Sequence, residues 1–61
     1  MMSMISMFEK VKILNNGIVG TVVDAYDRRG EKVYIVESDT RSPNGEYELY
    51  DCLAEELASN G

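Results

Sequence analysis

The sequence predicts a small, mainly β domain, an antiparallel sheet of four to five short strands that is tightly curled and ends in a short helical turn. Three observations predict this fold class. Apolar and polar residues alternate over several short runs, as in half-buried strands. Turn-forming residues separate these runs at even spacing. The chain of 61 residues is too short for two flat layers, so curling is the means of giving the sheet an interior.

The N-terminal segment MMSMISM contains all four methionines. We interpret residues 1–7 as a flexible Met-rich leader that the domain does not need, and residues 8–61 as one folded domain. The alternative is a Met-rich surface that binds a partner, because methionine side chains adapt to many shapes.

The first two predicted strands are residues 8–14 and residues 18–26. In the first, lysines alternate with Val11 and Ile13, and an Asn-Asn-Gly turn follows. The second is rich in β-branched residues, which favour strands. Gly20 lies inside it, and we expect a β-bulge or sharp bend there.

The third and fourth predicted strands are residues 32–38 and residues 46–50, separated by the polar loop DTRSPNG. The third is apolar on both faces, which is typical of a central strand. In the fourth, alternation places Tyr47 and Leu49 on one face, and the acids and Tyr50 on the other.

Residues 51–59 change period, because Leu53 and Leu57 fall on one helical face. The pattern predicts either a docked helical turn or a 3₁₀ turn that leads into a short closing strand. The expected core draws on every segment: Val11, Ile13, Val19, Val22, Val23, Val33 or Tyr34, Ile35, Val36, Leu49, Leu53 and Leu57.

Charge is distributed unevenly along the chain. The six acids and six bases of residues 1–45 cancel, and residues 46–61 hold five acids and no base, which accounts for the net charge of −5. Such a segment repels nucleic-acid phosphates and is compatible with a basic protein partner. A solvated face that keeps the protein in solution is the alternative reading.

Enzymatic chemistry is not expected. The chain has no histidine and one cysteine, Cys52, so it offers no Cys–His pair, no disulfide and no ordinary zinc site. Glu55 and Glu56 are adjacent and would not face each other as a catalytic pair. We expect no cofactor and no metal.

A cytoplasmic location is expected from the same sequence. No apolar run approaches the ~20 residues of a membrane span. The first residues lack the basic start and long apolar stretch of a signal peptide. A lone cysteine also fits a reducing compartment.

The segments Val11–Ile13, Asn16–Tyr26 (NGIVGTVVDAY) and Val33–Glu37 (VYIVE) resemble small bacterial SH3-like barrels. The similarity is to an uncharacterised family with a G-x-x-G-T-V-V-x-x-Y core and a following Y-x-V-E strand. It covers about residues 8–58 and is specific over residues 17–37. It implies an SH3-like barrel. The KOW motif of ribosomal and elongation proteins has a related G-x-x-G-x-V opening, which implies a nucleic-acid-associated module.

Candidate partner-binding residues are aromatic side chains, which are common in interfaces, and charged side chains at predicted turns and in the acidic segment. They are Tyr26, Arg28, Arg29, Tyr47, Tyr50, Glu46, Glu48 and Glu55.

Three function hypotheses remain. The first is a cytoplasmic protein-interaction or regulatory module of bacterial or phage origin, with a basic protein partner or a second copy of itself. The second is a KOW-like nucleic-acid module, which the acidic segment disfavours. The third is a phage-type inhibitor whose acidic face occupies a nucleic-acid-binding surface.

Overall fold

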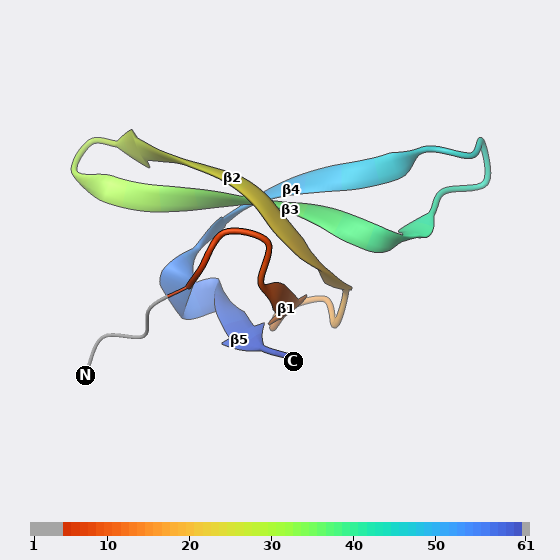
Figure 1. Ribbon diagram of the computed structural model, residues 1–61, viewed down its shortest axis with the longest axis horizontal. Coiled ribbons are helices and arrows are strands. Elements are labelled where there is room, and N and C mark those ends of the chain that lie inside the picture. Colours follow the sequence, from red (N-terminus) through yellow and green to blue (C-terminus); the bar gives the residue numbers. More distant parts are fainter. Residues whose placement is uncertain (1–4, 61) are drawn as a thin grey trace.

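The computed structural model describes residues 5–60, and they form one open, five-stranded antiparallel sheet in the order β4-β3-β2-β1-β5 (Figure 1). The mainly β prediction is confirmed. The strands are β1 (Lys10–Ile13), β2 (Val19–Arg28), β3 (Glu31–Arg41), β4 (Tyr47–Leu53) and β5 (Leu57–Ser59), with one 3₁₀ turn, η1 (Ala54–Glu56). The C-terminal segment is therefore a 3₁₀ turn that leads into a short strand. Within the described residues, no helix has the length and apolarity that a membrane crossing requires.

The turn between β1 and β2 forms where the Asn-Asn-Gly signal predicts it. The N–H of Gly17 donates to the carbonyl of Ile13 at 2.8 Å, and the N–H of Ile13 donates to the carbonyl of Ile18 at 2.7 Å. The Asn16 side chain accepts the Ile18 N–H at 2.9 Å. Gly17 has a φ of 75°, a conformation that glycine adopts without steric cost.

The long hairpins β2–β3 and β3–β4 extend to opposite sides of the molecule, and β1, η1 and β5 lie together below their crossing point (Figure 1). The β2–β3 pairing shifts register between Val22 and Asp24. Val23 is thus an extra residue on β2, a β-bulge that increases the twist of the strand. The sequence predicted a bulge or bend at Gly20, and the bulge lies three residues later in the same strand.

Gly20 has a different role, which is to permit a close approach between β2 and β3. It pairs with Ser38, and a Cβ at Gly20 would lie 2.3 Å from the carbonyl oxygen of Glu37 and 2.8 Å from a methyl carbon of Val36. Neither the β3 backbone nor the buried Val36 side chain can move far enough to relieve these two clashes without a cost in packing. The glycine is required for packing rather than for bending.

The sheet is strongly curved, because one apolar cluster contains buried side chains from all five strands. Its members are Val11, Ile13, Val22, Val36, Cys52 and Leu57. In a flat sheet the edge strands β4 and β5 would lie four spacings, or about 19 Å, apart. The presence of Cys52 of β4 and Leu57 of β5 in one cluster means that the two edges curl toward each other.

The face of β4 that points to this cluster is the opposite of the predicted one. Tyr50 pairs with the buried Val36, and Leu49 pairs with Glu37 and is 60% exposed. Cys52, which shares the face of Tyr50, is buried instead. The prediction of Leu49 in the core is wrong because a slip of one residue exchanges the two faces of a strand.

The remaining core predictions are confirmed in part. Val11, Ile13, Val22, Val36 and Leu57 are buried. Val33 is buried as well, but on the other face of β3, where it lies opposite Tyr26 and Leu53 in neighbouring strands. The other predicted core residues are half-buried: Val19, Val23, Tyr34, Ile35 and Leu53.

The last residues of the predicted leader, from Ile5 onward, contact the folded domain. Residues 1–4 lie outside the described residues. Ile5 packs against the apolar cluster, and Ser6 begins a turn in which its N–H donates to the Glu9 carboxylate at 2.9 Å. This contact holds the pKa of Glu9 below its ordinary value. Just before β1, the N–H of Phe8 donates to the Val22 carbonyl at 2.7 Å, so the chain is already hydrogen-bonded to β2 there.

We predict that Gly20→Ala destabilises the fold by about 1–3 kcal/mol, because the added methyl group meets the Glu37 carbonyl and Val36. The measurement is the free energy of unfolding in urea. Gly30→Asn is the control, since Gly30 has a positive φ and open space around it and asparagine tolerates that conformation. Equal losses in the two variants would show that the β2–β3 approach at Gly20 is not tight.

Candidate functional site

A groove of about 570 Å³ lies at the end of β3 beside the β1–β2 turn. Two of the candidate residues, Glu48 and Tyr50, line it from β4. Its volume is in the range of sites that hold a small ligand or a peptide side chain. Arg28 and Arg29 line a separate hollow of about 440 Å³ with Glu31 alone, whereas the groove brings candidate residues together with distant segments of the chain.

The walls of the groove come from three segments far apart in sequence. One wall is the turn and first residue of β2, residues 17–19, and the facing wall is the end of β3 and its loop, residues 38–43. Ile18, Val19, Pro43 and the Tyr50 ring make it partly apolar, and hydroxyl groups from residues 38, 40 and 42 add hydrogen-bonding atoms. A lining of this kind suits the stem of a long side chain with a polar head.

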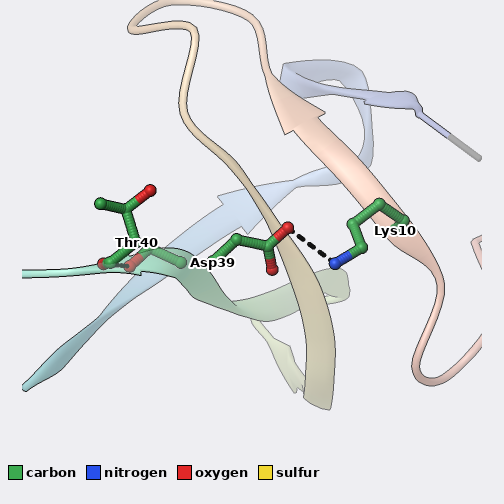
Figure 2. Close-up of polar contacts among 4 residues, drawn as sticks. Lys10, Asp39 and Thr40 are labelled. Carbon is green, nitrogen blue, oxygen red and sulfur yellow. Dashed lines mark hydrogen bonds and ion pairs between the residues drawn. The ribbon is translucent and has the colours of Figure 1, made fainter.

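Most charged groups of the groove already have a partner. Figure 2 shows the ammonium of Lys10 pointing at the carboxylate of Asp39, at 2.7 Å. The side chains of this ion pair are 42% and 39% exposed, so it contributes at most about 1 kcal/mol. Next to it, the Ser38 hydroxyl donates to the Thr40 carbonyl at 2.7 Å, which fixes the wall at the end of β3.

Arg41, which the sequence did not single out, is held by a tyrosine. Its guanidinium lies over the Tyr47 ring, 5.5 Å from the centroid, and its Nε donates to the Tyr47 hydroxyl at 3.2 Å. Arg41 and Tyr47 are register partners in β3 and β4. The sequence could not predict this pairing, because the register of β3 and β4 depends on the conformation of the loop between them. This pair forms the rim of the groove on the hairpin side.

Glu48 is the one carboxylate of the groove that forms no ion pair in the described structure. Its only hydrogen bond there comes from the Tyr50 hydroxyl, at 3.2 Å. Burial and the neighbouring Glu48 charge raise the pKa of Tyr50, so this phenol stays protonated and can keep donating. Glu48 thus retains acceptor capacity for a cation at the groove.

A smaller hollow of about 150 Å³, which we call the second hollow, is also lined by Tyr50. Tyr50, Asp51 and Cys52 line it from β4, and Ile13, Asn15 and Asn16 line it from the end of β1 and its turn. Glu56 completes it. Tyr50 therefore lines two hollows, and residues of β4 and of the β1–β2 turn contribute to both.

Cys52, the only cysteine, is buried beside this second hollow. Burial raises the pKa of its thiol, and the nearby charges of Glu56 and Asp51 raise it further. A thiol with a raised pKa is a poor nucleophile. No group of three or more acidic, Cys or His side chains converges as a metal site within residues 5–60.

Tyr26 lies away from both hollows, on the other face of the sheet. Its hydroxyl donates to the Asp51 carboxylate at 2.9 Å, which crosses from β2 to β4 over the intervening β3. That hydrogen bond is the main cause of the raised pKa of Tyr26. We interpret Tyr26 as a residue that covers the face of the sheet that holds the buried Val33 and the half-buried Ile35.

Arg28 and Arg29 lie at the far tip of the β2–β3 hairpin, where Arg28 pairs with Glu31. The acidic candidates are also separated: Glu46 is exposed in the loop before β4, and Glu55 is exposed in η1. The Glu56 side chain is engaged in the fold, since it accepts the Leu53 N–H at 2.7 Å. The predicted acidic face is therefore divided along the length of β4 and η1.

Comparison with models of protein families, with curated proteins and with solved structures gives no match. Functional inference therefore depends on the geometry of the groove and on the charges around it.

Arg29 offers a test of the hairpin tip. It has a φ of 54° and is followed by Gly30 with a φ of 84°, the conformation of a two-residue type I′ turn, in which Asn-Gly is strongly preferred. We predict that Arg29→Asn stabilises the fold by about 0.5–1 kcal/mol, because an arginine in the left-handed region is strained. The urea midpoint measures this, and an unchanged or lower midpoint would contradict the turn assignment.

Proposed function

We propose that this chain is a small, non-enzymatic interaction module of the cytoplasm that binds a basic segment of a protein partner in the groove beside Glu48 and Tyr50. The observation that carries the proposal is the place of Glu48. It is a carboxylate without an ion pair among the described residues, on the wall of a groove whose other charged residues, Asp39 and Arg41, already have side-chain partners. An arginine or lysine side chain matches that lining, with its stem on Tyr50 and Pro43 and its head at Glu48.

The charge distribution supports the same partner class. Residues 46–61 carry five acids and no base, and β4 and η1 hold four of them. The field of these groups favours the approach of a basic surface and disfavours phosphate backbones. The basic residues that a KOW-like module would use are divided between β1 and the distant β2–β3 tip, which does not favour nucleic acid.

We also propose that the curved sheet is an SH3-like barrel, as the sequence resemblance implies. Three features support this: β1 pairs with both β2 and β5, β4 and β5 are joined by a 3₁₀ turn, and both edge strands contribute to one apolar cluster. In such a barrel the groove would lie between the β1–β2 turn, the end of β3 and the edge strand β4.

The probe for the proposal is an acetylated ten-residue peptide of Gly, Ser and Thr with Arg at positions 3 and 7. We predict that it shifts the ¹⁵N–¹H resonances of the groove residues Gly17, Val19, Ser38 and Ser42 and that the shifts decrease as salt is raised. Glu48→Gln is expected to weaken binding about 3- to 10-fold, because one ion pair contributes roughly 1 kcal/mol.

Glu55→Gln is the matched control, since it makes the same change of charge within the acidic segment but outside the groove. It should weaken binding less than twofold. A peptide with Gln in place of both Arg residues should not shift these resonances. Equal effects of the two variants would show that only the general charge matters, and tighter binding of a ten-nucleotide RNA at 150 mM salt would replace the proposal with a nucleic-acid module.

A further inference from the structure

The backbone of β4 is unpaired along one side. In the order β4-β3-β2-β1-β5 it is an edge strand, and β3 is the only backbone partner of residues 47–52 in the described structure. In an antiparallel strand, alternate N–H and C=O groups point away from the neighbour. About half of the backbone groups of β4 are therefore free to pair with another chain.

Two hollows are lined by residues of this strand, and Tyr50 belongs to both. Glu48 belongs to the larger, Asp51 and Cys52 to the smaller, and the β1–β2 turn borders both. From Glu48 to Cys52 an extended strand covers about 14 Å. Two side chains about 14 Å apart on an added strand could therefore enter the two hollows, one beside Glu48 and the other beside Cys52.

We propose that the partner's basic segment binds in extended form as a sixth strand along β4, with basic side chains about four positions apart in the two hollows. This inference depends on the proposed function and specifies how the segment is bound. Glu48 lies at the first hollow and Glu56 at the second, so a cation is favoured at both ends. The Asp51 carboxylate accepts the Tyr26 hydroxyl on the other face of the sheet and adds only to the general negative charge.

The same charges disfavour a second copy of this chain at the edge. Two β4 strands side by side would bring the acids of one copy, Glu46, Glu48 and Asp51, close to those of the other with no base among them. Like charges on adjacent strands are destabilising. The acids thus disfavour edge-to-edge self-association and favour a basic strand.

The test compares the ten-residue Arg peptide with two N-methylated forms, one methylated at positions 4 and 6 and the other at positions 5 and 7. In a strand, amides of one set face β4 and amides of the other face solvent. One form should lose at least tenfold in affinity and the other less than threefold. The unmodified peptide should also shift Asn15 and Asn16 and slow the hydrogen exchange of alternate amides in residues 47–52.

The outcomes separate the two proposals. If the unmodified peptide binds at the groove but the two methylated forms bind alike and no amide of β4 gains protection, the added strand is overturned and the groove function stands. If the peptide binds nowhere near Gly17 or Ser38, both proposals are overturned. Concentration-dependent dimerisation of the free protein with protection of β4 amides would show that the edge pairs with itself.

Discussion

The structure depends on one small apolar cluster that all five strands share. Its six buried members are four β-branched residues, one leucine and one cysteine, so no single side chain dominates it. Each contributes roughly 1–3 kcal/mol by leaving water. Because Ile13 pairs with Leu57 and Val11 pairs with Gly20, β1 connects the edge strand β5 to β2 and to this cluster. The curvature of the sheet, the proximity of its edges and the position of the groove all follow from this packing.

Two local features of β2 make the curvature possible. Gly20 allows the backbone of β3 to approach within a distance that no other residue would permit, and the bulge at Val23 adds twist where the long hairpin leaves the core. The Tyr26–Asp51 hydrogen bond then joins β2 and β4 across β3 on the other face. These features set the direction in which the β2–β3 hairpin extends from the core.

Alternation and turn signals predicted the strands and the order of the turns well, because these depend on neighbouring residues. They did not predict which face of β4 points to the core, since the loop before it carries no information about which residue faces inward. Leu49 was expected in the core but is exposed, and Cys52 is buried instead. The candidate residues Glu48 and Tyr50 were found from charge and residue type. Their groove partners at residues 17–19 and 38–43 could not be, because only the curl of the sheet brings these segments together.

The binding proposals require that the curl places β4 beside the end of β1 in solution. Ile13 and Cys52 belong to the same cluster and line the same hollow, although they are 39 positions apart in the sequence. The most direct test is the nuclear Overhauser effect between the Cys52 β protons and the Ile13 methyl protons in the free protein. The account predicts a clear cross-peak of the same order as that between the paired Val22 and Val36. Its absence, with the Val22–Val36 cross-peak intact, would show a sheet that does not curl, and would contradict the account.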